Sequence, residues 1–277
     1  MGRLVFIGAG LMGGRWLTLK GLQRAKEVDH LFGEFYTSYL GMSGIEDLKR
    51  EIGREIVLLT REELEMGEKV FDALEEGDVG LIVGGDPMAA TTHVELRLEA
   101  ERRGHETEIV YGVSILVAAP SAMGLQHYKF GMFVIVPCFS ESFALKSVLD
   151  VIDGNLKEGL HTLLLLDLKE DGGFMTVSES LKTLKYLEER HRKGVIDDNT
   201  LVVGGARIGD RTEYIKGGRL RDLLEVDFGP PVHVVVIPGR LHFVEEEALM
   251  KIASVKEEEI SHWRKRIDEK YKGLIPS

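Results

Sequence analysis

The first 111 residues alternate between short apolar runs and longer stretches in which apolar residues recur with helical spacing. The apolar runs predict strands at residues 4–7, 30–35, 56–59, 79–83 and 108–111. Helices are expected at residues 17–28, at 45–52, in the acidic stretch after Thr60, and at 92–103. Thr60 with Glu63, and Thr92 with Glu95, have the spacing of a helix capping box. Such alternation is typical of a mainly parallel sheet covered by helices.

The second part of the chain has a different pattern. Strands are expected at residues 133–136, 162–166, 201–203 and 232–237, with weaker candidates at 174–175 and 214–216. Helices are expected at 143–152, at 177–190, where Thr176 and Glu179 have capping spacing, and at 244–253. The chain becomes rich in Gly, Ala, Ser and Pro near residues 112–118, which predicts domains at 1–113 and 114–277. The second domain is expected to be mixed α+β, with a charged surface helix at about 256–271.

Composition narrows the class of protein. A chain of 277 residues has room for one large domain or two of ordinary size. No apolar run approaches the roughly 18 residues of a membrane span, and the N-terminus enters a strand pattern at once, so neither a membrane helix nor a secretory signal is expected. The net charge of −11 argues against nucleic acid as the main partner and leaves small molecules, or a protein with a basic patch.

Candidate metal ligands and nucleophiles are few. The single cysteine, Cys138, excludes an internal disulfide and a cysteine metal cluster, fits a reducing cytoplasm, and is expected to be a small core residue. The histidines show no metal-binding spacing, and His233 and His242 are each expected to be structural. Neither a GxSxG nor a Walker A sequence occurs, which disfavours hydrolase and NTPase chemistry.

Glycine-rich loops after strands indicate where a ligand would bind, because ligands of α/β sheets collect at the carboxyl ends of strands. Gly8–Gly13 is a complete GxGxxG after an apolar run, and Glu34 follows about 20 residues later, which together form the dinucleotide-binding fingerprint. A plain glycine turn is an equal alternative there. Gly84–Pro87 leaves the acceptor-only carboxylate of Asp86 at the end of a buried strand, where it needs a partner or a ligand. A plain turn is an equal alternative for this loop as well. Gly204–Arg207 and Pro238–Arg240 are further loops of this kind.

The segment 85–93 reads Gly-Asp-Pro-Met-Ala-Ala-Thr-Thr-His, and with it the chain resembles a known family. That family is the diphthine synthases, within the tetrapyrrole-methylase-like class of S-adenosylmethionine-dependent methyltransferases. The match extends over most of the chain, with supporting segments at 34–38, 128–131, 159–164, 197–203, 227–233 and 238–242. Together these segments are far more specific than a single GxGxxG.

The resemblance implies an α/β fold of the two-domain tetrapyrrole-methylase type, with S-adenosyl-L-methionine between the domains, and a homodimer. It implies methylation of the amino group of the modified histidine (amino-carboxypropyl-histidine) of translation elongation factor 2, a step of diphthamide biosynthesis. No metal and no membrane contact are implied, and no catalytic base is assigned. The cofactor contacts that the resemblance assigns are Leu11, Asp86, Ala89, Ser114, Ile115, Leu168, Ile208 and His233.

The chain departs from the family where relatives often carry an acidic run after the first glycine loop. Here the sequence is Gly13-Gly14-Arg15-Trp16, in a region expected to face the acceptor. Three alternatives stay open at this point: a small-molecule (tetrapyrrole-type) methyltransferase, an NAD-dependent oxidoreductase that uses Gly8–Gly13 and Glu34, and a cofactor-binding regulator without catalysis.

Overall fold

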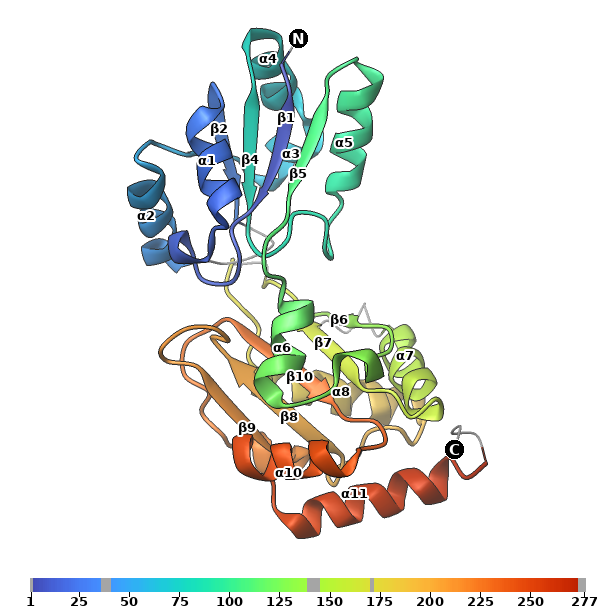
Figure 1. The fold of residues 1–277 in the computed structure, drawn as a ribbon. Helices are drawn as coiled ribbons and strands as arrows, with labels where there is room; N and C mark the ends of the chain where they lie inside the picture. The colour runs from blue at the N-terminus through green and yellow to red at the C-terminus, as the bar shows by residue number, and fades with distance from the viewer. Residues whose placement is uncertain (1, 36–40, 139–144, 170–171, 274–277) are drawn as a thin grey trace. The chain divides into compact units, whose positions relative to one another are not determined.

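The computed structural model describes residues 2–35, 41–138, 145–169 and 172–273, and the chain divides into two compact units, Met1–Leu116 and Val117–Ser277 (Figure 1). Two predicted features fall outside the described residues: the start of the helix expected at 143, and positions 36–38 of one supporting segment.

The first unit is built on one fully parallel sheet in the order β3-β2-β4-β1-β5. Its strands are β1 (Leu4–Gly8), β2 (His30–Glu34), β3 (Val57–Leu58), β4 (Val79–Val83) and β5 (Thr107–Val110). Its helices are α1 (Leu19–Glu27), α2 (Gly41–Ile52), α3 (Arg61–Met66), α4 (Glu68–Glu76) and α5 (His93–Arg102), with a short 3-10 turn, η1 (Gly14–Trp16). The expected parallel sheet is confirmed.

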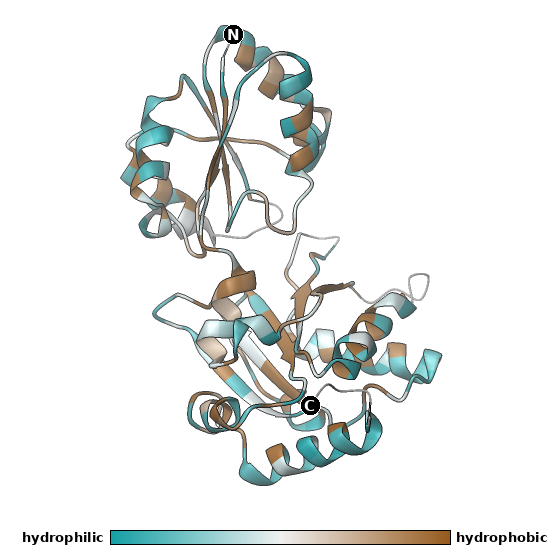
Figure 2. Ribbon diagram, turned by 45° about the vertical axis from the view of Figure 1, so that its right-hand side comes forward, coloured by the Kyte–Doolittle hydropathy of each residue, from teal (hydrophilic) through white to brown (hydrophobic). Residues whose placement is uncertain are grey.

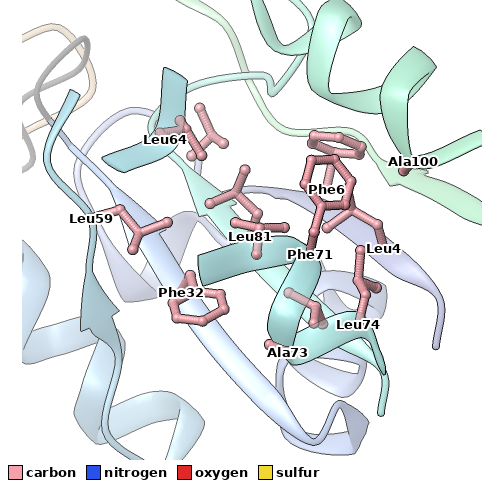
Figure 3. Packing of buried hydrophobic residues seen from close by; sticks show 13 residues of the cluster. Leu4, Phe6, Phe32, Leu59, Leu64, Phe71, Ala73, Leu74, Leu81 and Ala100 are labelled. Atoms are coloured by element: carbon pink, nitrogen blue, oxygen red, sulfur yellow. The ribbon is translucent and has the colours of Figure 1, made fainter. Parts of the chain in front are cut away.

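Both faces of this sheet are covered, because successive side chains of β1 point to opposite sides. Leu4 and Phe6 belong to a core that includes residues of α3, α4 and α5, and Figure 3 shows them gathered with Phe71 and Leu74. Val5 and Ile7 belong to a second core with residues of α1 and α2. A strand buried on both faces reads as a continuous apolar run, which is why β1 and β4 are easily recognised in the sequence.

The second unit contains a mixed sheet in the order β6-β7-β10-β8-β9, parallel between β6 and β7 and antiparallel elsewhere. Its strands are β6 (Val134–Val136), β7 (Thr162–Leu166), β8 (Leu201–Ala206), β9 (Tyr214–Arg219) and β10 (His233–Ile237). The helices are α6 (Ile115–Met123), which begins just before the division of the units, η2 (His127–Lys129), α7 (Lys146–Lys157), α8 (Val177–His191), α9 (Leu220–Leu223), α10 (Phe243–Ile252) and α11 (Glu257–Lys270). The predicted mixed α+β architecture is confirmed.

Two adjacent glycines let bulky side chains from other parts of the second unit approach both faces of this sheet. A side-chain carbon on Gly204 would lie 2.5 Å from the Phe228 ring, and one on Gly205 would lie 2.9 Å from the methyl group of Met123 in α6. The prediction of a loop at Gly204–Arg207 is therefore wrong for its first three residues, which are the end of β8. Their small side chains serve close packing in a strand rather than a turn.

The C-terminal helix α11 is charged on its outer side and apolar toward its own unit, where Ile260, Trp263 and Ile267 are buried. The indole N–H of Trp263 donates to the carbonyl oxygen of Gly239 at 3.3 Å. In Figure 2 the strands carry mostly hydrophobic colours, whereas helices carry hydrophilic and hydrophobic colours on different sides. The expected surface helix is thus also part of the core of the second unit.

Most predicted elements occur within a few residues of the expected bounds, and the exceptions have local causes. Capping boxes at Thr60 and Thr176 are confirmed. The capping box expected at Thr92 is wrong, because the backbone there is not extended and its side chain caps nothing. The weak strand at 174–175 reduces to an isolated bridge between Leu168 and Phe174. Among the described residues, no helix is long and apolar enough to cross a membrane.

The helix α6 was not predicted, because Pro120 and the small residues around it resemble a loop in the sequence. Burial of Ala119, Pro120 and Met123 in the second unit stabilises the helix in spite of the proline.

Candidate functional site

The loops that follow β1 and β4 are joined beyond the carboxyl edge of the first sheet. The N–H of Gly10 donates to the carbonyl oxygen of Gly85 at 3.1 Å, and the N–H of Gly85 donates back to Gly10 at 2.8 Å. This pair of bonds forms an isolated antiparallel bridge between two otherwise parallel chain segments. The two glycine loops singled out in the sequence are therefore one structural feature.

The carboxylate of Asp86 links the loop after β5 to the loop after β4. Its Oδ1 accepts from the N–H of Met88 at 3.0 Å, and its Oδ2 accepts from the N–H of Gly112 at 3.3 Å. Each oxygen has a second lone pair, and the side chain is only partly buried. Asp86 thus orders the edge and keeps acceptor capacity for a ligand.

The three loops approach so closely that glycine is required at their contacts. A side-chain carbon on Gly112 would lie 2.2 Å from the Gly85 carbonyl oxygen, and one on Gly8 would lie 2.5 Å from the Gly112 nitrogen. Gly85 differs, because a carbon added there would meet nothing nearer than 4.0 Å. Its φ of +72° still favours glycine, so backbone conformation rather than crowding of a side chain explains glycine at position 85.

Five of the eight residues assigned by the resemblance lie on these three loops or, for Ile115, directly after the third: Leu11, Asp86, Ala89, Ser114 and Ile115. All five are partly exposed. The hydroxyl of Ser114 accepts from the N–H of Leu116 at 3.2 Å and so caps the start of α6. Residues far apart in the sequence thus supply one carboxylate, one hydroxyl and three apolar side chains to a single edge.

The loop after β4 is held in place by His93, the last residue of the segment 85–93 that supports the family resemblance. The Pro87 carbonyl oxygen accepts from Nδ1 of His93 at 2.8 Å and from the Thr91 hydroxyl at 3.3 Å. On its other side the ring of His93 lies 3.8 Å, Nε2 to Oε2, from the carboxylate of Glu34. Both side chains are buried. A buried acid at the end of β2 was a signal for this contact, but the sequence could not identify its partner.

The GxGxxG does not form a dinucleotide site. Gly13 and Gly14 pack on the α2 backbone, where added side-chain carbons would lie 2.8 Å from the Gly44 oxygen and 2.7 Å from the Asp47 oxygen. The following helix, α1, begins only after Thr18, whose hydroxyl accepts from the N–H of Gly21 at 3.0 Å. Since η1 separates that helix N-terminus from the glycines, and Thr18 already caps it, the helix offers no pyrophosphate cradle of the usual kind.

The remaining assigned residues, Leu168, Ile208 and His233, share one edge of the second sheet. Leu168 follows β7, Ile208 follows β8, and His233 begins β10, which is antiparallel to both. The N–H of Arg207 donates to the Val232 carbonyl at 2.8 Å and links the last two segments. Ile208 is buried, whereas Leu168 is partly exposed.

The imidazole of His233 is already used within the protein. Its Nδ1 accepts from the N–H of Val177 at 3.3 Å, while Nε2 faces the carbonyl oxygens of Gly229 and Pro230 at 3.1 and 3.2 Å. Burial lowers the pKa of His233, and the carbonyl contacts oppose this only in part. A neutral ring with its hydrogen on Nε2 satisfies all of these contacts.

The Pro238–Arg240 loop belongs to the opposite edge of the second sheet, because β10 runs antiparallel to β7 and β8. There the buried carboxylate of Glu245 accepts from Nε2 of His161 at 2.9 Å and from Lys129 at 2.5 Å. His161 in turn accepts from the N–H of Gly239 at 2.8 Å. The expectation that this loop lies with the other ligand-side loops is wrong, and the three supporting segments that meet here form a structural network.

Comparison with known proteins places this geometry in a family. A model of the tetrapyrrole (corrin/porphyrin) methylases matches residues 3–224. Diphthine synthases from Methanosarcina mazei and Methanosphaera stadtmanae are 42% and 39% identical to the chain, each covering 92% of it and 97% of the relative. The chain belongs to the tetrapyrrole methylase family, and within it to the diphthine synthases.

A crystal structure of a diphthine synthase superposes with a TM-score of 0.84 at 34% identity, covering 94% of this chain and 99% of that one. The predicted family, fold class and enzyme class are therefore confirmed: the chain is a methyltransferase of this family. The NAD-dependent oxidoreductase alternative is not supported by any of these findings.

Proposed function

We propose that the protein transfers methyl groups from S-adenosyl-L-methionine to the amino group of the modified histidine of translation elongation factor 2, in diphthamide biosynthesis. The main support for the proposal is the set of charged residues on the three joined loops. Residues 8–14, 84–92 and 111–115 contain one carboxylate, Asp86, and neither lysine nor arginine, and Arg15, which follows the first range, is exposed in η1. Such a set suits a ligand with a sulfonium and an ammonium charge, whereas a dinucleotide pyrophosphate calls for donors and positive charge.

The residues at this edge fit the parts of such a cofactor. Leu11, Ala89 and Ile115 would contact its apolar surfaces, and the free lone pairs of Asp86 would accept from a hydroxyl or ammonium group. Leu168 and Ile208 are proposed as further apolar contacts of the cofactor. His233 is proposed to contribute through its backbone, because its ring nitrogens already have protein partners.

Methyl transfer requires little acid–base catalysis from the protein. When bound, S-adenosyl-L-methionine supplies a methyl group on a positively charged sulfur, and the departing thioether is neutral. Binding and alignment of amine, methyl carbon and sulfur, with exclusion of water, can therefore supply most of the rate enhancement. The attacking amine must be neutral and loses its proton afterwards; we assign no residue of this chain as the base.

The acceptor and the assembly state are proposals of the same kind. Membership of the diphthine synthases supports elongation factor 2 as the substrate, and the net charge of −11 favours a partner with a basic surface. A cytoplasmic location and a homodimer as the active form are proposed with it, on the family resemblance alone. The second candidate is a small-molecule methyltransferase, favoured by the family's tetrapyrrole methylases. Gly13–Trp16 is proposed to lie toward the acceptor.

Calorimetry and a methylation assay test the proposal. The protein should bind S-adenosylhomocysteine, should show no measurable affinity for NADH, and should transfer labelled methyl groups to elongation factor 2 that carries the amino-carboxypropyl-histidine. Transfer to a porphyrinoid instead would support the second candidate. Tight binding without turnover on either acceptor would indicate a cofactor-binding regulator, and failure to bind S-adenosylhomocysteine would overturn the proposal.

A further inference from the structure

We propose that His93 is a positioning residue for the methyl-donor site, and that it acts by holding the Asp86–Pro87 turn from inside the first unit. The inference rests on the proposed function, because it assumes that the loop after β4 binds the donor. His93 is the first residue of α5 and is 4% exposed, so it does not reach a ligand itself.

The contacts of His93 form a closed set with the loop. Its backbone N–H donates to the Thr91 hydroxyl at 3.0 Å, that hydroxyl donates to the Pro87 carbonyl oxygen, and Nδ1 of the ring faces the same oxygen at 2.8 Å. A carbonyl oxygen can only accept, so Nδ1 carries the hydrogen. A ring rotated by 180° would present a C–H group to Pro87 and lose this bond.

The surroundings of the ring fix that orientation. Nε2 faces the Glu34 carboxylate at 3.8 Å, and the Phe6 ring lies 6.3 Å away, centroid to centroid. Glu34 is fully buried. An apolar residue at position 93 would avoid the cost of burying a polar ring in this core. We therefore infer that His93 and Glu34 do more than fill the core. His93 acts on the loop through its hydrogen bond to the Pro87 carbonyl oxygen.

The position of Pro87 determines that of the site residues beside it. Asp86 precedes it directly, and the Asp86 carboxylate and carbonyl accept from the N–H groups of Met88 and Ala89 at 3.0 and 3.2 Å. Ala90 has a φ of +57°, a conformation that costs a non-glycine residue about 1–2 kcal/mol. Such a loop relaxes when its anchoring bonds are removed, and Asp86 and Ala89 would then move together.

The first unit contains a matched control. His105 is 2% exposed, its Nδ1 faces the Gly2 carbonyl oxygen at 3.1 Å, and its Nε2 lies 3.5 Å from the carboxylate of Glu75. This histidine precedes β5 and therefore lies at the amino edge of the sheet, opposite the joined loops. Its burial and bonding resemble those of His93, but it holds no site loop.

The experiment compares His93→Ala, His93→Asn and His105→Ala by calorimetry with S-adenosylhomocysteine and by thermal unfolding. We expect His93→Ala to weaken binding at least tenfold, and His93→Asn, whose amide can donate to Pro87, to recover most of that loss. His105→Ala should lose comparable stability and keep the wild-type affinity within twofold. Long-range ¹H–¹⁵N spectra, assigned with the variants, should show hydrogen on Nδ1 of His93.

Several results would overturn the inference. They are wild-type affinity in His93→Ala, equal weakening in His105→Ala, no recovery in His93→Asn while it remains folded, or absence of hydrogen from Nδ1 of His93. If the wild-type protein itself does not bind S-adenosylhomocysteine, the proposed function fails first, and the inference fails with it for that distinct reason.

Discussion

The carboxylate of Asp86 accepts a hydrogen bond from the N–H of Gly112 at 3.3 Å, although the two residues belong to loops after β4 and β5. These strands are not neighbours, because β1 lies between them. The bond therefore passes over the end of β1 at Gly8, where a side-chain carbon would lie 2.5 Å from the Gly112 nitrogen and 2.7 Å from the Gly85 oxygen. One carboxylate and three glycines together define the carboxyl edge of the first sheet.

Asp86→Ala should lower affinity for S-adenosylhomocysteine at least tenfold while the protein stays folded. The variant removes the acceptors of Met88 and Gly112, which should cost about 1–2 kcal/mol of unfolding free energy in urea titrations. Asp78→Ala is the control, because Asp78 accepts from the N–H of Arg3 at 2.7 Å and precedes β4, at the amino edge. Asp86 would be a purely structural residue if both variants lost stability and neither lost affinity.

Gly112→Ala should destabilise the first unit by about 2–4 kcal/mol, because a carbon 2.2 Å from the Gly85 oxygen forces backbone movement. Gly154→Ala should instead increase the free energy of unfolding. Gly154 lies on the exposed side of α7, where an added carbon meets nothing within 4 Å, and alanine is favoured there by about 0.5–1 kcal/mol. Thermal and chemical unfolding of both variants would check this, and a stable Gly112→Ala would contradict the packing described.

Glu245→Gln should destabilise the second unit by about 2–4 kcal/mol at pH 7. Burial raises the pKa of Glu245, but hydrogen bonds from His161, the His242 N–H and Lys129 outweigh it and lower the pKa from 4.5 to about 2. A carboxyl whose pKa is depressed by folding stabilises the protein above its unfolded value and loses that contribution as the pH falls toward 2. The gap between wild type and variant should therefore shrink between about pH 4.5 and pH 2.

Urea unfolding of wild type and Glu245→Gln at several pH values measures that gap. Glu247→Gln, on the exposed side of the same helix, should stay within about 0.5 kcal/mol of wild type throughout. A gap that stayed constant across the acid range would mean that Glu245 does not titrate differently in the folded state.

The two tryptophans should report on the two units separately. Trp16 lies against Gly10, where an added carbon would meet its Cβ at 2.6 Å, whereas Trp263 is buried in the second unit. With Trp263→Phe, titration of S-adenosylhomocysteine should produce a saturable change in the emission of Trp16. With Trp16→Phe, the emission of Trp263 should respond to unfolding of the second unit and show little response to the ligand. The reverse assignment would place the donor away from the first glycine loop.

Local structure was largely readable from the sequence. The strands β4 and β7 occur at the predicted residues, because buried apolar runs bounded by glycine or polar turns have few alternatives. Capping boxes at Thr60 and Thr176 could be recognised because they depend only on residues three positions apart. The family followed from motifs in the same way.

Contacts between distant segments were decided only by the tertiary structure. The GxGxxG looked like a dinucleotide loop because spacing does not reveal that Gly13 and Gly14 pack on α2, or that Thr18 caps the next helix. The Pro238–Arg240 loop resembled a ligand loop because the residues of a strand do not show whether it runs parallel or antiparallel to its neighbours.

The sequence by itself determined most of the strands, the capping boxes at Thr60 and Thr176, the family and the single carboxylate of the ligand-side loops, since each depends on neighbouring residues or on a motif. The structure alone decided that Asp86 reaches Gly112 across β1, and that His93 joins Pro87 to Glu34. The physical reason is that strand order and helix packing bring these groups together from far apart in the chain, and each buried polar group takes the partner that the fold supplies.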